Sequence, residues 1–389
     1  MERYYNITIT EKRRPGNSSR AASPGAPGKR KKPKGQGRLM GLDFLRAFLM
    51  LLVIIGHVTS TYLDAESGVS FLGMNLAFFL NQSGRFSVPL FILLSGFSLE
   101  LRAKEESYLS FLKGRAIHIL PPYVAWLLLY ELSNCGFDLK AWLVRLGDLP
   151  WLCKDFLTGQ AAPHLYFIPI IFQCYLFYPL LKGWVRRAPL ESAAWAMAVT
   201  FLLQSTYVLQ GLGFLPAFQG PYLWMTFPLW CFYFVAGMCL QKVDFSWLRA
   251  ICRRNVVALA LVTGAFGCLH SAISKYTGLL HAVKPELMLF ALVFFFWGIG
   301  TWELIGGWAF LRKTVSFLSR HSMGIYYNHV MVLCFLRQFS RFQQGMSGML
   351  LLLLATSCLS LAVAVGLSLA RRAATFLLGR CFQKICHIV

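Results

Sequence analysis

The sequence predicts an all-α protein, a polytopic membrane bundle of about ten transmembrane helices. Of its 389 residues, 57% are hydrophobic and 14% are charged, whereas soluble domains carry about 25% charged residues. Apolar stretches of roughly 20 residues, the length at which a helix crosses a bilayer, recur from residue 42 to residue 370. Lys and Arg residues are concentrated in every second loop between these stretches, as expected for a chain that crosses a membrane repeatedly.

The predicted transmembrane stretches are residues 42–62, 71–101, 118–134, 164–181, 190–209, 221–241, 255–273, 286–306, 322–340 and 347–370. The second stretch is too long for one straight helix. Pro89 lies inside it and cannot donate a backbone hydrogen bond in a helix interior. We therefore expect a break there, with residues 71–84 as a short outer or re-entrant segment.

The chain divides into three predicted parts. Residues 1–38 are rich in Lys, Arg, Pro, Gly and Ser and cannot bury enough apolar surface to fold. They predict a disordered basic cytosolic tail beside anionic lipid headgroups. Residues 39–372 form the ten-helix membrane domain, and residues 373–389 form a short cytosolic C-terminal tail.

The loop charges predict a multi-pass protein of the cell membrane with cytosolic N- and C-termini. The basic residues of the predicted inner loops and C-terminal tail are Arg102, Lys104, Lys113, Arg115, Lys182, Arg186, Arg187, Lys242, Arg249, Arg253, Arg254, Arg312, Lys313, Arg320, Arg371, Arg372, Arg380 and Lys384. Those of the predicted outer loops are Lys140, Arg145, Lys154, Lys275, Lys284, Arg337 and Arg341. Because basic loops stay in the cytosol, topology accounts for the net charge of +22. Nucleic-acid binding is therefore not expected.

The first stretch carries the strongest candidate for chemistry. Asp43 and Arg46 lie at its start, and His57 follows eleven residues after Arg46. Eleven residues are about three helical turns, so Arg46 and His57 share one face, roughly 16 Å apart along the axis. A cation at the inner edge would hold the phosphates of a long donor, and the imidazole could act as a general base on a hydroxyl. In the alternative interpretation, Asp43 caps the helix, Arg46 anchors it in the membrane and His57 is a packing residue. Because ionisable groups are costly to bury in lipid, we favour a functional role for the three residues.

Two further segments have alternative interpretations. Arg85 lies within an apolar stretch and could hold a substrate group, pair with a carboxylate or reach the outer headgroups. Ser95 precedes Gly96, a pair of small residues that also permits close helix packing. Lys113 and Arg115 lie just before a predicted helix start, where backbone N–H groups favour anions, although topology explains the same charges.

These segments resemble the acyltransferase family 3 membrane proteins. The family's first helix has Arg or Lys, ten residues and then His, as in Arg46…His57 here. Its Val-Pro-Leu-Phe…Ser-Gly-Phe stretch is similar to Val88…Phe97, and its basic loop running into Pro-Tyr is similar to Lys113…Tyr123.

Two later segments extend the resemblance over residues 40 to 370, with the order of the motifs kept. His164–Ile168, which includes Tyr166, is similar to the family's His-Leu-Trp-Phe-Leu segment. Ser322…His329, which includes Tyr326, is similar to its penultimate-helix motif. Two positions depart from the pattern, because His118 follows Arg115 where relatives often have a second arginine, and Tyr166 replaces a common Trp.

The resemblance implies transfer of an acyl group, usually acetyl, from cytosolic acyl-CoA to a hydroxyl of a cell-surface or lipid-linked glycan, as in polysaccharide O-acetylation. The catalytic residue is then His57, and Arg46, Lys113 and Arg115 bind the donor's phosphates. The supporting residues are Asp43, Arg85, Ser95, His164, Tyr166, Tyr326 and His329. No metal is expected.

Several alternatives stay open at this level. A polysaccharide exporter would need a continuous polar path through its spans, and an acyltransferase for a small-molecule acceptor would share the same motifs. Direct transfer and a covalent acyl-histidine are both compatible with His57. Glu131, Glu286 or Glu303 could orient His57 or pair with Arg85, and His164 and His329 could contact the acceptor or simply pack.

Overall fold

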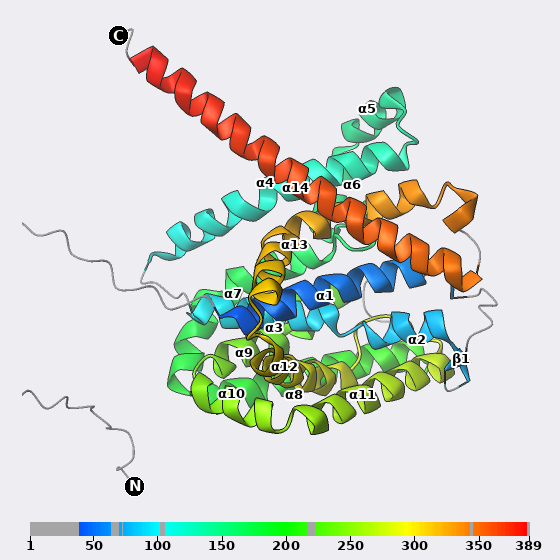
Figure 1. The fold of residues 1–389 in the computed structure, drawn as a ribbon, viewed down its shortest axis with the longest axis vertical. Helices are drawn as coiled ribbons and strands as arrows, with labels where there is room; N and C mark the ends of the chain where they lie inside the picture. The colour runs from blue at the N-terminus through cyan, green and yellow to red at the C-terminus, as the bar shows by residue number, and fades with distance from the viewer. Residues whose placement is uncertain are drawn as a thin grey trace, which may run out of the picture. The chain divides into compact units, whose positions relative to one another are not determined.

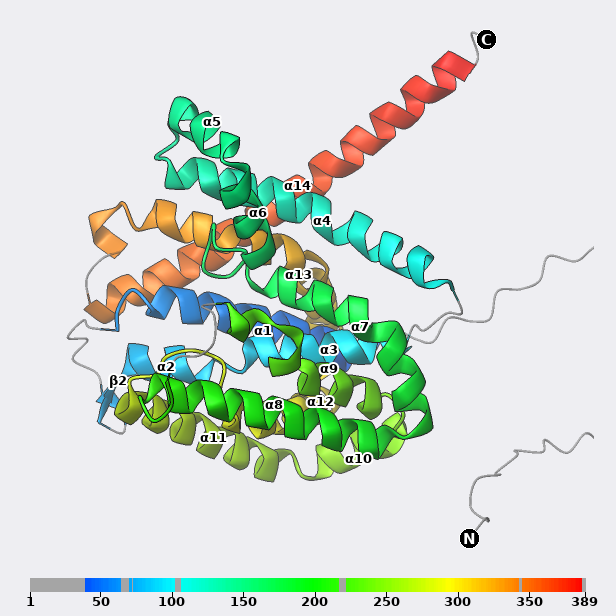
Figure 2. The same ribbon diagram turned by 180° about the vertical axis from the view of Figure 1, so that it is seen from behind.

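The computed structural model describes residues 39–63, 70–71, 73–101, 106–216, 222–342 and 345–386. The predicted tail, residues 1–38, lies outside these ranges. The described part is almost entirely helical (Figure 1, Figure 2), which confirms the all-α fold class. It contains one small antiparallel sheet, β1 Ser70–Phe71 with β2 Met74–Asn75.

The α-helices in chain order are α1 Met40–Thr59, α2 Leu76–Ser83, α3 Ser87–Leu101, α4 Tyr108–Asn134, α5 Leu139–Gly147, α6 Leu149–Thr158, α7 Phe167–Arg187, α8 Pro189–Gly211, α9 Cys231–Leu240, α10 Phe245–Arg254, α11 Val256–Thr277, α12 Glu286–Ile305, α13 Ala309–Leu336 and α14 Gly345–Cys386. Three short 3-10 helices are η1 Leu223–Met225, η2 Phe227–Leu229 and η3 Ser340–Phe342.

Each of the ten predicted transmembrane stretches contains a helix. Within the described residues, eight helical stretches are long and apolar enough to cross a membrane: Met40–Thr59, Leu76–Leu101, Tyr108–Asn134, Phe167–Arg187, Pro189–Gly211, Val256–Thr277, Glu286–Ile305 and Gly345–Thr375. The other two predicted stretches contain α9, which has only 10 residues, and α13, which has 28 residues and a basic first half.

The predicted break in the second stretch is confirmed. Helix α2 ends at Ser83 and α3 begins at Ser87. Pro89 lies in the first turn of α3, where a backbone N–H would have no partner within the helix. The break thus precedes the proline by about one turn, because proline is tolerated at a helix start and not in a helix interior.

The predicted start of the third stretch is wrong. Helix α4 begins at Tyr108, where the Ser107 hydroxyl accepts a hydrogen bond from the Ser110 backbone N–H at 3.3 Å, and it continues through Pro121 and Pro122. Lys113 and Arg115 therefore lie inside the helix rather than just before its start. Their backbone N–H groups belong to the helix, so only their side chains can contact an anion.

Two further segments contain more helix than the sequence predicted. The long segment between α4 and α7 contains the two short helices α5 and α6, capped by Asp138 and Asp148. Helix α14 is 42 residues long and runs past residue 370 to Cys386, extending away from the other helices in both views (Figure 1, Figure 2). Most of the predicted C-terminal tail thus continues the last helix.

Helix α1 lies between two apolar cores. It packs against α2, α3, α12, α13 and α14. Its first half, including Leu45 and Leu49, belongs to a core built mainly by α3, α7, α9 and α12. Its second half, including Ile54 and Val58, belongs to a second core built mainly by α4, α13 and α14. The polar residues of α1 are therefore held at the junction of the two halves of the bundle.

Helices α3 and α9 approach each other through two glycines. A Cβ atom added to Gly96 would lie 2.1 Å from the Phe234 carbonyl oxygen, and one added to Gly237 would lie 2.0 Å from the Leu93 carbonyl oxygen. Both obstacles are backbone atoms, which cannot rotate away as a side chain can. Gly96 therefore has a packing role, as the alternative interpretation of the Ser95–Gly96 pair proposed for its small residues.

A buried ion cluster joins α3 and α9 to α7. The Glu100 side chain is 1% exposed and bonds to Lys242 Nζ at 2.5 Å and to Arg186 Nε at 3.2 Å. The Tyr178 hydroxyl donates to its second carboxylate oxygen at 3.1 Å. A buried carboxylate is tolerated only when it is paired in this way, and these bonds tie α3 to α7 and to the end of α9.

We expect Gly96→Ala to lower the stability of the bundle, because the new methyl group must push two backbones apart. Overpacking of this kind costs about 1–3 kcal/mol. Thermal unfolding of the purified protein in detergent measures the change. The matched control is Gly264→Ala, since a Cβ there meets no atom within 4 Å and should raise helix propensity slightly. Equal melting temperatures for Gly96→Ala and wild type would contradict the close-approach interpretation.

Candidate active site

The Arg46 end of α1 is a network that links three helices. Arg46 Nη1 lies 3.3 Å from Asp43 Oδ1, and Arg46 Nη2 donates to the Ser98 hydroxyl on α3. Asp43 also accepts a hydrogen bond from the Ser319 hydroxyl on α13 at 2.8 Å. Asp43 thus orients Arg46 from the first turn of α1, and it is not the N-cap residue of this helix, which is Leu39.

Arg115 lies close to the same end of the bundle. Its guanidinium carbon is 5.3 Å from the centre of the Phe111 ring and 5.8 Å from the centre of the Tyr175 ring on α7. The Tyr175 side chain interacts with Ser95 and lies within electrostatic range of both Arg115 and Arg46. The structure therefore brings Arg46, Ser95 and Arg115 around one tyrosine.

Lys113 does not join this group. It is exposed on α4, and residues two positions apart on a helix face in different directions. His118, one turn further along, is also exposed, and its Nδ1 lies 2.7 Å from the Gly114 carbonyl oxygen.

The His57 end of α1 holds a cluster of three histidines. The ring centre of His57 is 5.1 Å from that of His329 on α13 and 6.1 Å from that of His164. The His164 and His329 rings are 4.8 Å apart. His164 precedes α7, so residues from three separate parts of the chain meet here. Within the described residues, no group of His, Cys, Asp and Glu side chains is arranged to hold a metal ion.

Hydrogen bonds orient the His329 ring, whereas His164 is held through its backbone and by ring packing. His329 Nδ1 lies 2.8 Å from the Tyr326 carbonyl oxygen and 3.1 Å from that of Ile325. Because carbonyls only accept, we assign the hydrogen of the neutral ring to Nδ1, which leaves Nε2 as an acceptor. The Tyr326 hydroxyl donates to the His164 carbonyl oxygen, and the Tyr130 ring packs edge-on against the His164 ring.

The ring nitrogens left over from these bonds are buried and available. His329 Nε2 and both ring nitrogens of His164 have no hydrogen-bond partner within the described residues. Buried polar atoms in native proteins nearly always have partners, so such a concentration beside a cavity marks a place where a substrate group or a proton would bind.

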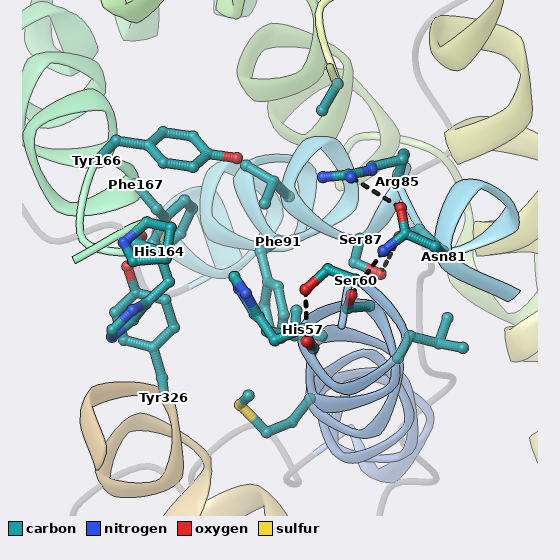
Figure 3. A pocket seen from close by; sticks show the side chains of 18 of the residues that line it. His57, Ser60, Asn81, Arg85, Ser87, Phe91, His164, Tyr166, Phe167 and Tyr326 are labelled. Carbon is teal, nitrogen blue, oxygen red and sulfur yellow. Dashed lines mark hydrogen bonds between the residues drawn. The ribbon is translucent and has the colours of Figure 1, made fainter. Parts of the chain in front are cut away.

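A cavity of about 340 Å³ opens beside the histidines (Figure 3). This volume is in the range of small-molecule sites. Its polar lining residues are His57, Ser60, Asn81, Arg85, Ser87, His164, Tyr166, Ser322 and Tyr326. The remaining wall is largely apolar and includes Phe91 and Phe167. His57 and Arg85 thus line the same partly open cavity, whose largely apolar walls make electrostatic effects stronger than in water.

Arg85 is held at the opposite side of this cavity from His164 (Figure 3). Its Nη2 donates to Asn81 Oδ1 at 2.8 Å, and Asn81 Nδ2 donates to the Gly56 carbonyl oxygen on α1 at 2.6 Å. The Tyr166 hydroxyl points across the cavity towards the guanidinium (Figure 3). Within the described residues no ion pair joins Arg85 to a carboxylate, and its hydrogen-bond partner is the neutral Asn81, which argues against the carboxylate alternative for Arg85.

The three acids considered as partners of His57 all pair elsewhere. Their nearest opposite groups are Arg145 for Glu131 at 3.0 Å, His270 for Glu286 at 3.0 Å, and Arg249 for Glu303 at 3.6 Å. The described part of the chain therefore surrounds His57 with imidazoles in place of an orienting carboxylate.

Sequence reasoning named all three histidines but missed several residues that position the site. Asn81, which bonds to Arg85, was one of them. The two residues are four positions apart, a spacing that predicts a contact within a helix, but α2 ends at Ser83, between them. Ser98 and Ser319 carried no signal, because isolated serines are common in membrane helices as packing residues.

Comparison with known proteins identifies the same region. The model of the Acyl_transf_3 family, described as an acyltransferase domain, matches residues 40–369. The "Putative membrane-bound acyltransferase YfiQ" of Bacillus subtilis (strain 168) is 24% identical over 261 residues, 63% of this chain and 67% of that protein. The "Nodulation protein NolL" of Mesorhizobium japonicum (strain LMG 29417 / CECT 9101 / MAFF 303099) is 27% identical over 227 residues, 57% of this chain and 59% of that protein. No solved structure gives a significant match.

Proposed function

The chain belongs to the acyltransferase 3 family of membrane acyltransferases, and we propose that it transfers an acetyl group from cytosolic acetyl-CoA to a hydroxyl of a cell-surface or lipid-linked glycan. The observation that carries this proposal is the position of His57. It lines a cavity beside two further histidines, about three helical turns from the cation Arg46. That distance suits a donor whose phosphates and thioester lie at opposite ends of a flexible arm.

The donor binds from the Arg46 end in this scheme. Arg46 and Arg115, which both lie near Tyr175, contact phosphate oxygens of coenzyme A through charge-assisted hydrogen bonds. Lys113, exposed on α4, adds a weaker and more strongly screened attraction at the entrance. The acyl thioester then reaches the cavity between α1 and α13.

The chemical step is a direct transfer. His57 removes the proton from the acceptor hydroxyl as its oxygen attacks the thioester carbonyl carbon. The tetrahedral intermediate collapses with cleavage of the carbon–sulfur bond. The coenzyme A thiolate takes the proton from the imidazolium, which leaves free coenzyme A, an O-acyl ester and neutral His57.

Two neighbouring groups assist this step. The Tyr166 hydroxyl, which faces the cavity (Figure 3), donates to the developing oxyanion. His329 Nε2, an acceptor without a partner within the described residues, shares the proton held by His57. An imidazole in this place does the work that a carboxylate does in many acyltransfer sites.

The first prediction concerns orientation, since the scheme needs the Arg46 end in the cytosol and the His57 end outside. In a variant with Cys135→Ser and Cys153→Ser, an added Gly147→Cys should react with a membrane-impermeant maleimide on intact cells, whereas Gly35→Cys should react only after permeabilisation. The parent variant gives the background labelling. The reverse pattern would overturn cytosolic termini and the direction of transfer.

The second prediction concerns the donor. Arg115→Ala should raise the KM for acetyl-CoA by about 10- to 150-fold, because a hydrogen bond to a charged group contributes about 1.5–3 kcal/mol. Initial rates with the purified protein measure it. Arg187→Ala is the matched control, since Arg187 is an exposed basic residue at the end of α7. An unchanged KM for Arg115→Ala would leave Arg115 as a topology signal alone.

The third prediction concerns His57. Loss of a general base slows an enzyme by roughly 10²–10⁴-fold, so His57→Gln should abolish acyl groups on the glycan while the glycan still reaches the cell surface. Base-labile ester release measures acylation, and lectin or antibody binding measures surface polymer. His329→Gln should cause a smaller loss of acylation rate, because it assists the proton transfer without making it.

The control for both histidine variants is His321→Gln, which removes a half-exposed imidazole from α13, where its hydrogen bond among the described residues is to its own helix, at the Phe317 carbonyl oxygen. If polymer disappears from the surface and the remaining polymer is normally acylated, the protein is an exporter. If neither quantity changes, His57 is a packing residue and the proposed reaction is wrong.

A further inference from the structure

The Arg85 side of the cavity carries positive charge without a matching acid. Among the residues that line the cavity, Arg85 is the one permanent cation and no lining residue is acidic. Asn81 is a neutral partner for one nitrogen of the guanidinium, and Arg85 Nε is buried without a partner within the described residues.

A second cation lies behind Arg85, in the segment between α11 and α12. Lys284 is 1% exposed, and its Nζ donates to the Ser274 hydroxyl at 2.6 Å. Burial lowers the pKa of Lys284 to about 8, and the charge on the neighbouring Arg85 contributes to the shift. The ammonium group is therefore still mainly protonated at neutral pH. Ala282, two residues earlier, lines the cavity itself.

The other titratable groups in this region do not cancel the two charges. His281 is neutral, because burial and the charge of Lys284 lower its pKa to about 4. Glu286 is the one carboxylate within range of Lys284, and it is hydrogen-bonded to His270 at 3.0 Å. Two cations against one carboxylate leave an excess of about one positive charge beside a largely apolar space.

Such an excess is costly in a membrane bundle unless something compensates for it. The described part of this chain shows the usual solution at Glu100, where two cations and a tyrosine surround one acid. Arg85 has no such shell, and its free edge faces the cavity (Figure 3). The missing partner is therefore a group that enters the cavity.

We propose that the Arg85 side of the cavity is a subsite for an anionic group, a carboxylate or a phosphate, carried by the glycan acceptor close to the hydroxyl that is acylated. The inference rests on the proposed function, since it specifies the acceptor of that reaction. A bidentate contact between a guanidinium and a carboxylate or phosphate also fixes orientation, so the subsite would align the acceptor hydroxyl with His57.

The donor does not supply this anion. Its phosphates belong at the Arg46 end, and Arg85 lies beside the opposite end of α1, where Asn81 joins Arg85 to Gly56. The part of the donor that reaches His57 is the uncharged thioester. The anion must therefore arrive with the second substrate.

Direct binding, measured without any acyl donor, tests the proposal. The probes are cellobiuronic acid and cellobiose, which differ in one carboxylate, and glucose 1-phosphate and methyl glucoside, which differ in one phosphate. Binding to the purified full chain in nanodiscs is followed by microscale thermophoresis. We expect at least one anionic probe to bind ten-fold or more tightly than its neutral counterpart, and the preferred pair identifies the acceptor's anion as carboxylate or phosphate.

Variants assign that preference to the subsite. Arg85→Gln should remove it, Lys284→Gln should reduce it and Arg85→Lys should restore part of it. Lys275→Gln, which alters an exposed lysine at the end of α11, should leave it unchanged. Melting temperatures identify any variant that fails to fold, in which case the Arg85→Lys comparison decides.

Equal binding of charged and neutral probes, including no binding by any of them, overturns the subsite, and so does a preference that survives Arg85→Gln. These outcomes are separate from failure of the proposed reaction. If the wild type transfers acetyl from acetyl-CoA to neutral and acidic acceptors alike, the subsite is wrong and the reaction stands. If it transfers to none, the reaction is wrong whatever the probes show.

Discussion

The carboxylate of Asp43 holds the arrangement on which the site depends. It accepts hydrogen bonds from Arg46 on its own helix and from Ser319 on α13, and so it fixes two parallel helices at one end. His57 lies about four turns further along α1, and His329 about three turns further along α13. The contact between Asp43 and Ser319 therefore helps to set the position of α13 along α1, and with it the meeting of the two imidazoles. A change at Asp43 would therefore disturb the cation that it orients and the histidine pair beyond it.

The membrane makes such contacts decisive, because a polar group in a bundle has few neighbours that can satisfy it. Glu100 and Arg85 show two outcomes of the same constraint. Glu100 is enclosed by Arg186, Lys242 and Tyr178, which makes it a tie between helices. Arg85 has a neutral partner in Asn81 and an open side towards the cavity. An ionisable residue in a membrane helix is thus structural where the protein itself supplies all of its polar partners. It is functional where one side is left open for a substrate.

The sequence predicted the helices, the break before Pro89 and the pairing of Arg46 with His57 along one helix face, because all of these follow from local periodicity and composition. It named His164 and His329 without bringing them to His57, since more than a hundred positions separate them in the chain and no periodicity reports such contacts. In the described part of the chain, the acids that could have oriented His57 or paired with Arg85 do neither, for a related reason. Glu131, Glu286 and Glu303 are near spans in sequence, but only packing reveals that Arg145, His270 and Arg249 reach them first. The start of α4 was missed because the predicted apolar stretch begins at residue 118, whereas the helix begins ten residues earlier, at Tyr108.

Segments that resemble family motifs and segments that do not have different roles in the proposed reaction. The segments that resemble family motifs supply Arg46, His57, Arg115 and His329, which bind the donor or take part in the transfer step of the proposed reaction. Lys284 and His281 come from the segment between α11 and α12, which carries no such motif, yet both lie within electrostatic range of Arg85. Acceptor choice and reaction type would then be encoded by different parts of the chain. In such a protein, changes at Arg85 and in the segment between α11 and α12 would alter the choice of acceptor, while α1 and α13 would still hold the reacting groups.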